Sequence, residues 1–225
     1  LHAYALPNDH EFSRFQTDAA GNPSYKQQFG YSELKNASDN RYFISWRDDR
    51  HFASNWTSHV DFADVSDPYY FQDFGNEPEV IATNQLLREA RTDYYSDHWH
   101  MDAIVQDYQT LNAVNRQPIN TLYGRLPQFD INGEYPNIDG ADVFLHSQAV
   151  YFNRSLGAAD MREPVDGSRL LLQPGVSIPQ IWRWGYVDPG VQVQLRQYDL
   201  KHTLPQQRSS RQYAMPIYDI DTGIF

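Results

Sequence analysis

The strongest constraint on the fold of this chain is a two-residue alternation of apolar and polar side chains that recurs along most of its length. Within residues 191–196, valine or leucine stands at every odd position and glutamine or arginine at every even one. Successive side chains of a β-strand point to opposite faces, whereas an α-helix repeats its apolar positions roughly every 3.6 residues. The alternation therefore predicts strands that each have one apolar and one strongly polar face.

Helical periodicity is nearly absent from the sequence. The best helical candidate, residues 84–94, carries only Leu86, Leu87 and Ala90 as an apolar stripe and has no convincing cap at either end. We therefore predict an all-β fold, an antiparallel meander of about ten strands. The predicted strands lie near residues 1–7, 39–48, 54–64, 80–94, 98–108, 119–131, 142–153, 168–178, 187–199 and 212–224.

The connections between the predicted strands differ systematically in length. Short turns (DDRHFA, SDHW and WRWGYV) alternate with long polar loops at residues 8–38, 65–79, 154–167 and 200–211. Short turns at one end of a meander and long loops at the other are typical of a transmembrane β-barrel. Aromatic residues also gather at the strand ends beside the short turns, as in the girdle of such a barrel at a membrane interface. They are Trp46, Trp56, Tyr94, Tyr95, Trp99, Trp182, Trp184 and Tyr186.

The polar face of the strands is the surface on which we expect function. Histidine, glutamine, arginine and aspartate are costly inside a dry sandwich core but suit the water-filled lumen of a barrel. The predicted lumen-facing residues are His59, Asp61, His100, Asp102, Gln106, Tyr108, His146, Gln148, Arg169, Gln192, Gln194 and Arg196. The alternative is a soluble carbohydrate-binding or glycoside-hydrolysing β-sandwich, in which tyrosine and phenylalanine clusters would stack on sugars.

Composition excludes several classes of function. The formal net charge is −11 and the lysines and arginines do not cluster, so nucleic acid is not an expected partner. The sequence has no phosphate-binding loop or other nucleotide motif, and its lack of cysteine excludes disulfides and thiolate metal sites within this stretch. We expect the chain to be neither an enzyme nor a cofactor-binding protein. The chain starts abruptly inside a predicted strand, without a leader peptide or a transmembrane helix. We therefore expect it to be an internal piece of a longer protein.

The segment VSDPYYFQDF, residues 65–74, combines acids and aromatic rings, and no basic residue lies between Arg50 and Arg88. Carboxylates in such a region could form the acid and base of a glycosidase or bind a divalent cation. The acids concerned are Asp61, Asp64, Asp67, Asp73, Glu77 and Glu79. We favour a third interpretation, in which Asp-Pro begins a turn and the rings pack the loop at the outer rim. The predicted loop-packing residues are Asp67, Pro68, Tyr69, Tyr70, Phe71, Asp73 and Phe74.

The segment HWHMD, residues 98–102, is a weak candidate for a metal site. His98, His100 and Asp102 have the two-residue spacing of ligands on one strand. No further ligand is evident in the sequence. We therefore interpret these side chains as the lining of a polar lumen or turn and predict no metal site.

Several longer segments resemble a known family. They are YALPND at residues 4–9, VSDPYYFQDFGN at 65–76, VQDYQTL at 105–111, YGRLPQFDIN at 123–132, GSRLLLQPGVSIP at 167–179 and MPIYDIDTGIF at 215–225. In this order they resemble the middle of the LptD family, the lipopolysaccharide-assembly proteins of Gram-negative outer membranes, formerly called organic solvent tolerance proteins. The resemblance spans essentially the whole chain.

The resemblance implies an arc of a very large barrel in the cell outer membrane. Such a barrel receives lipopolysaccharide from a periplasmic bridge bound to its N-terminal domain, holds an LptE-type plug lipoprotein inside, and inserts lipopolysaccharide into the outer leaflet. We therefore expect residues 1–225 to be a partial transmembrane β-barrel domain without the family's N-terminal periplasmic domain or closing strands. The lumen-facing residues would contact the plug or lipopolysaccharide, the loop 8–38 would help to cap the outer mouth, and the arc would expose two strand edges.

Overall fold

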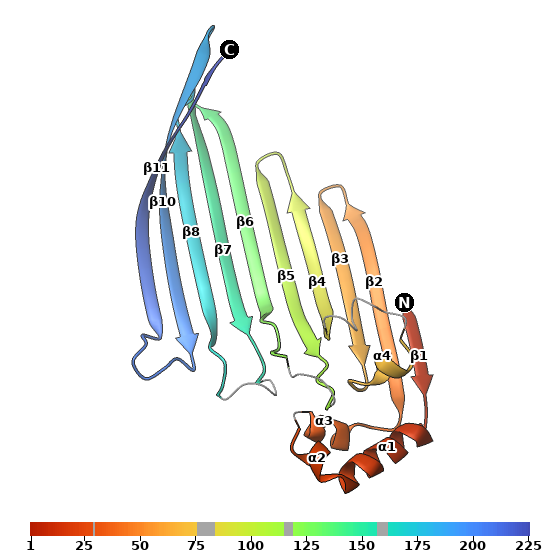
Figure 1. The fold of residues 1–225 in the computed structure, drawn as a ribbon. Coiled ribbons are helices and arrows are strands. Elements are labelled where there is room, and N and C mark those ends of the chain that lie inside the picture. Colours follow the sequence, from red (N-terminus) through yellow and green to blue (C-terminus); the bar gives the residue numbers. More distant parts are fainter. Residues whose placement is uncertain (29, 76–83, 115–118, 157–161) are drawn as a thin grey trace.

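A single antiparallel sheet dominates the computed structural model, which describes residues 1–28, 30–75, 84–114, 119–156 and 162–225. Each long strand pairs with the strands before and after it in the sequence, while the short β9 pairs only with β10 (Figure 1). The strands are β1 (His2–Leu6), β2 (Arg41–Ala53), β3 (Trp56–Val65), β4 (Gln85–Tyr95), β5 (Trp99–Thr110), β6 (Gly124–Ile138), β7 (Ala141–Asn153), β8 (Asp166–Ser177), β9 (Gln180–Trp182), β10 (Gly185–Lys201) and β11 (Ser210–Ile224). The predicted all-β antiparallel meander is thereby confirmed.

The predicted strand limits differ from the observed ones mainly at the hairpins. Residues 85–95 form a strand, as predicted, and not a helix. The segment DDRHFA, predicted as a turn, continues β2 as far as Ala53, so that Trp46 lies inside the strand opposite Phe62 rather than at its end. Similarly, β6 extends to Ile138. Alternation weakens where polar residues occupy both faces, and long hairpins therefore look shorter in the sequence than they are.

The two ends of the sheet differ as expected. Short turns join the strands at one end, and the long connections lie at the other end together with the helices (Figure 1). Among the described residues, β1 and β11 each pair with one neighbour and not with each other, so the sheet is open.

The expectation that helices are nearly absent is wrong for the loop 8–38. The helices are α1 (His10–Gly21), α2 (Pro23–Lys26), α3 (Tyr31–Asn36) and, after β3, α4 (Tyr70–Asp73). The side chain of Asp9 accepts a hydrogen bond from the amide of Phe12 and caps α1, and the side chain of Asn22 caps α2 with Pro23 in its first turn. These caps are visible in the sequence, but the apolar stripe of α1 is too short to predict a helix by itself. No helix in the described parts of the chain is long and apolar enough to cross a membrane.

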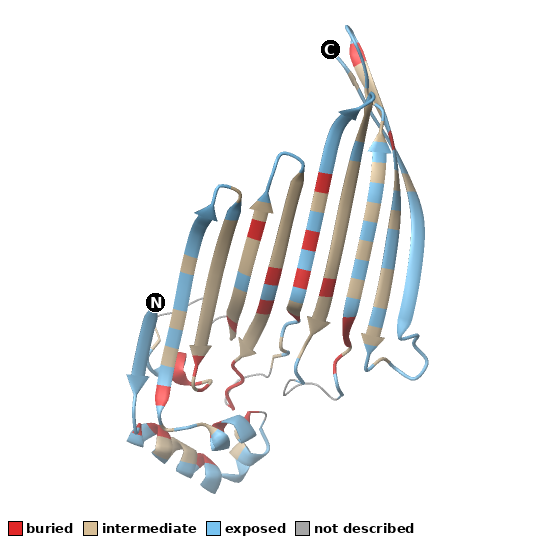
Figure 2. Cartoon of the chain, turned by 180° about the vertical axis from the view of Figure 1, so that it is seen from behind, coloured by how far each residue is buried: buried red, intermediate tan, exposed pale blue. Residues whose placement is uncertain are grey.

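The hydrophobic core lies at the long-loop end of the sheet. One buried cluster joins α1 and α3 to Tyr69 and to the segment after β5, and it consists of Phe12, Ala19, Leu34, Tyr69, Ala113 and Val114. A second cluster lies at the ends of β3, β4 and β5, and it consists of Val65, Tyr70, Phe71, Leu86 and Leu111. Most strand residues away from this end are exposed or half-buried (Figure 2). The core therefore anchors the loops and does not hold two sheets together.

Candidate functional site

The strand register places all twelve predicted lumen-facing residues on one face of the sheet. Residues directly opposite one another in paired strands share a face. One row of opposed residues runs from Asp61 through Glu89 to Gln106, and another runs from His100 through Asn132 to His146. The other members of the set lie on the same face for one of two reasons. Some are an even number of residues away from these rows on the same strand, and the others lie opposite polar-face residues in the pairings of β7, β8, β10 and β11. We call this surface the polar face.

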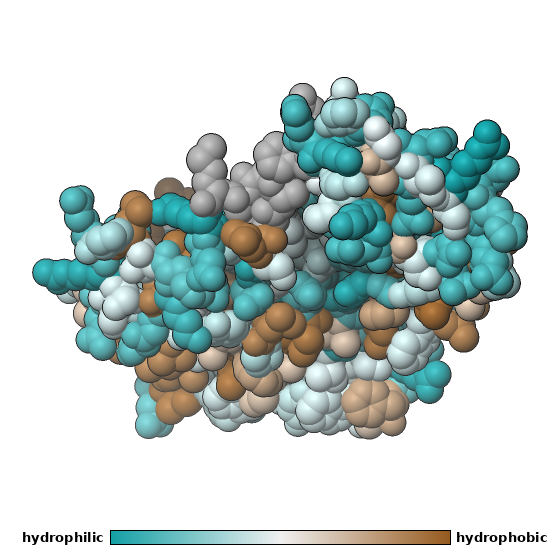
Figure 3. Space-filling model, turned by 90° about the horizontal axis from the view of Figure 1, so that it is seen from below, coloured by the Kyte–Doolittle hydropathy of each residue, from teal (hydrophilic) through white to brown (hydrophobic). Residues whose placement is uncertain are grey.

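The opposite surface of the sheet, here called the apolar face, carries hydrophobic side chains that no other part of the described chain covers. Viewed along the strands from the long-loop end, hydrophobic residues gather along one side of the molecule (Figure 3). Leu172 in the middle of β8 is 38% exposed, although it lies opposite Leu195 of β10. Other large exposed side chains of this face are Ile44, Trp46, Val105, Phe129, Ile131, Val143, Leu170, Val176, Val191, Val193, Leu195, Tyr218 and Ile220.

Hydrogen bonds link side chains across the polar face from β6 to β10. The amide of Gln148 donates to Asp130 over 2.7 Å and its carbonyl oxygen accepts from Arg169. The amide of Gln194 donates to the side-chain oxygen of Gln173 over 2.7 Å. Each bond joins two strands, so the polar groups of this face are held in place by their neighbours.

From β2 to β4, ion pairs join side chains on the polar face. The guanidinium of Arg47 lies 2.7 Å from Asp61, and the ring of His59 lies 2.6 Å from Asp49. Farther along, Arg91 bonds Asp93 over 2.6 Å. The polar face is thus rich in paired charges here, which fits a surface in contact with water.

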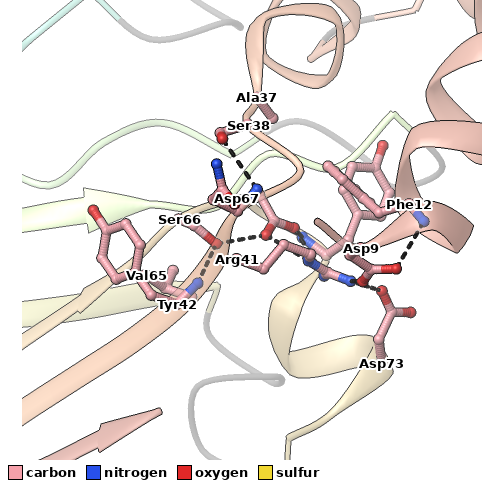
Figure 4. A network of polar contacts seen from close by, with 12 residues as sticks. Asp9, Phe12, Ala37, Ser38, Arg41, Tyr42, Val65, Ser66, Asp67 and Asp73 are labelled. Atoms are coloured by element: carbon pink, nitrogen blue, oxygen red, sulfur yellow. Dashed lines mark hydrogen bonds and ion pairs between the residues drawn. The ribbon is translucent and has the colours of Figure 1, made fainter. Parts of the chain in front are cut away.

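A buried arginine organises the loops at the base of the sheet. Arg41, the first residue of β2, is 2% exposed. Its guanidinium donates two hydrogen bonds to Asp67, of 2.9 and 3.0 Å, and further bonds to Asp9 at 3.1 Å and Asp73 at 2.8 Å (Figure 4). The ring of Phe12 lies 4.4 Å from its central carbon. Two loops that are distant in sequence are thereby fixed to one strand.

The aromatic segment after β3 packs around this cluster. Tyr69 is buried against α1, and its hydroxyl accepts a hydrogen bond from the amide of Val114 over 2.8 Å. Burial raises the pKa of Tyr69 to about 12. Tyr70 and Phe71 are buried in the second cluster, whereas Phe74 is 49% exposed and packs against Tyr70 with the two ring planes tilted by 58°. Pro68 lies in the half-buried turn that leads into α4.

The acids of this region acquire basic partners only through the fold. Arg41 neutralises Asp67 and Asp73, Arg47 pairs with Asp61, and Arg88 pairs with Asp64. The arginines come from neighbouring strands and are distant in sequence from the acids they meet, which is why no basic partner was evident. Glu77 and Glu79 lie outside the described residues. The acids that the structure describes are therefore occupied in ion pairs, which disfavours a free carboxylate pair of the glycosidase type.

Sequence reasoning missed two residues of the Arg41 cluster. Arg41 stands at the start of a predicted strand and gives no signal of its own. Asp9 follows the YALPN segment and carries the signal of a helix cap, since a Glu and an apolar residue follow it. Asp9 and Arg41 come into contact because the loop 8–38 leads back to the start of β2.

Comparison with known proteins agrees with this geometry. Residues 39–224 match the family described as LPS transport system D. The LPS-assembly protein LptD of Legionella pneumophila strain Lens is 32% identical over 98% of this chain, and its counterpart in Coxiella burnetii strain RSA 493 is also 32% identical over 98%. The LPS-assembly protein LptD of Pseudomonas syringae pv. syringae strain B728a is 30% identical over 91%.

The match covers only part of each relative. The chain spans 26% of the Legionella and Coxiella proteins and 24% of the Pseudomonas protein, about a quarter of their length. The family match nevertheless covers most of the present chain, and the relatives match it over nearly all of its length. This chain therefore belongs to the LPS transport system D (LptD) family.

Proposed function

We propose that this chain forms an arc of the wall of an outer-membrane β-barrel that assembles lipopolysaccharide into the outer leaflet. The observation that carries the proposal is the separation of the two faces of the sheet, with hydrogen-bonded polar groups on one and exposed hydrophobic side chains on the other. Family membership supplies the substrate class, since the relatives are named as LPS-assembly proteins.

The apolar face meets lipid and the polar face lines the lumen. Transmembrane barrels satisfy all backbone groups between strands and expose an apolar band to the hydrocarbon. In this orientation the polar face contacts water, lipopolysaccharide head groups and a plug lipoprotein of the LptE type. The helices α1–α3 lie beside the long-loop ends of the strands and help to cap the outer mouth. The periplasmic bridge meets a separate N-terminal domain of the complete protein.

This segment forms part of the wall along which lipopolysaccharide passes, and it carries out no catalysis. Several carboxylates of its polar face are paired with arginines, as Asp61 is with Arg47 and Asp93 is with Arg91. A soluble sandwich, the alternative, would require a second sheet packed on the apolar face. The described residues form one sheet, and that face is open.

Site-specific photocrosslinking in the complete natural protein tests the proposal. A photoreactive residue at Gln194 faces the lumen and is expected to trap lipopolysaccharide or the plug in living cells. The matched control is the adjacent Val193, which lies on the apolar face of the same strand and is expected not to trap the plug. Equal trapping of the plug from both positions, or trapping of the plug from Val193 alone, would show that the faces are assigned wrongly.

A further inference from the structure

Three carboxylates lie side by side on the polar face near the short turn between β4 and β5. The register places Asp93 opposite Asp102, and Asp102 opposite Asp130, across three central strands. Like charges directly opposite one another in a sheet destabilise it. Arg91 lies 2.6 Å from Asp93 and 3.9 Å from Asp102, so one guanidinium is shared by two of the three carboxylates. The row therefore favours binding of further positive charge.

The imidazole of His100 lies beside two of these carboxylates, those of Asp93 and Asp102. The ligand atoms of Asp93, His100 and Asp102 all lie within 4.8 Å of one another. The Nε2 atom of His100 is shielded from solvent and has no hydrogen-bond partner among the described residues, and it lies 3.7 Å from Asp93 Oδ1. Side chains of both aspartates are about nine-tenths buried, with exposed fractions of 10% and 9%. One ring nitrogen and two carboxylates thus converge, while the His100 side chain as a whole is 37% exposed.

We propose that Asp93, His100 and Asp102 bind a divalent transition metal of the zinc type. Tetrahedral bonds of about 2.1 Å separate ligand atoms by about 3.4 Å, close to the 3.7 Å between His100 Nε2 and Asp93 Oδ1. A mixed set of one imidazole and two carboxylates suits zinc or manganese better than calcium or magnesium, which prefer oxygen ligands alone. A fourth position remains for water or a passing anionic group.

The neighbours of the three ligands have the arrangement that a metal site requires. The ring of His100 stacks on Tyr95 with centroids 4.3 Å apart and the planes 8° from parallel, which fixes its orientation. Arg91 hydrogen-bonds Asp93 and holds that carboxylate in place. Asp130 accepts hydrogen bonds from Gln128 and Gln148, so it adds negative charge without acting as a ligand.

The structure gives a different set of candidate metal ligands from the sequence. The sequence offered His98 with His100 and Asp102, and no further ligand. In the structure the ring of His98 lies 3.0 Å from the backbone oxygen of Glu134 and stacks on Tyr135. The third ligand is Asp93, which β4 brings opposite Asp102.

Calorimetric titration of the metal-stripped complete protein in detergent with zinc chloride tests the proposal. Wild type and the control His98→Gln are expected to bind zinc equally. His100→Gln and Asp102→Asn are expected to lose one equivalent, or to bind it at least tenfold more weakly. No zinc binding by wild type, undiminished binding by His100→Gln, or an equal loss in His98→Gln overturns the proposal.

A second measurement covers the case in which His100→Gln does not fold. X-ray absorption at the zinc edge of the loaded wild-type protein is expected to show an imidazole together with oxygen ligands. A shell of oxygen ligands alone overturns the proposal.

Discussion

At the scale of single residues, the buried Arg41 joins two loops to the start of β2. Burial of a guanidinium is costly unless every donor finds a partner, and here Asp9, Asp67 and Asp73 together with aromatic rings supply those partners. Because the partners belong to two different loops, this one residue determines how both loops meet the sheet.

Replacement of Arg41 by alanine is expected to destabilise the complete protein by about 3–5 kcal/mol, because it leaves buried carboxylates without a counter-charge. Arg47→Ala on the same strand is the matched control. Its side chain is 72% exposed and pairs with Asp61, and a surface ion pair contributes about 0–1 kcal/mol. Urea unfolding in detergent measures both, and limited proteolysis should cut the loop 8–38 faster in the Arg41 variant alone. Equal stability of the two variants would contradict this reading.

Asp9 gives the same cluster a pH dependence. Burial alone would raise the pKa of the Asp9 carboxyl, but hydrogen bonds from the Phe12 amide and the Arg41 guanidinium hold that pKa below its ordinary value. The charged form is therefore favoured in the folded state. Its stabilisation is present above the ordinary pKa of about 3.9 and is lost as pH falls through the lower folded value.

Asp9→Asn isolates this effect, because asparagine still caps α1 while the charge is removed. At pH 7 the variant is expected to expose the loop 8–38 to protease more than wild type does. The difference is expected to shrink between about pH 4 and pH 2, as the wild-type carboxyl becomes protonated. An acid-stable protease such as pepsin at low pH and a neutral protease at pH 7 would measure it. A difference that stays constant with pH would show that the charge of Asp9 is unimportant.

At the scale of elements, each strand has two surfaces that meet different surroundings. Adjacent leucines in β8 illustrate this, since Leu172 lies opposite Leu195 on the apolar face and Leu171 lies opposite Arg196 on the polar face. Hydrophobicity alone does not distinguish the two leucines. Only the register shows which of them meets lipid in the proposed barrel.

Leu172→Arg is expected to destabilise the complete protein by about 2–4 kcal/mol, the cost of a basic side chain at the lipid face near the middle of a bilayer. Leu171→Arg, one position away, is the control and is expected to have little effect because it enters the hydrated face. Folded outer-membrane yield and the mobility shift of unheated samples in gels measure the two variants. A larger defect in the Leu171 variant would reverse the assignment of the faces.

At the scale of the whole molecule, the absence of a central core is the most informative property. The two buried clusters lie at the long-loop end of the described sheet, and hydrophobic side chains along the strands remain exposed. A soluble domain of this size would bury such residues between layers. Among the described residues, β1 and β11 each have one unpaired edge. In the barrel proposed above, these are the edges that further strands would pair.

The sequence by itself determined the strand class, the order of the meander and the division into a polar and an apolar face. These properties depend on local alternation, which survives without knowledge of any contact. It also led to the family, through motifs such as VSDPYYFQDFGN and YGRLPQFDIN.

Only the tertiary structure decided which residues meet. The partners Arg41 and Asp67 lie 26 residues apart, and Asp93 faces Asp102 through strand pairing rather than through spacing. Helix α1, which follows Asp9, and helix α3 pack against Tyr69 and the segment that follows β5. This tertiary packing stabilises α1 although its apolar stripe is short. Alternation specifies the two faces of each strand. The contacts across strands depend on the pairing register and on the paths of the loops, which are long-range properties that no local pattern encodes.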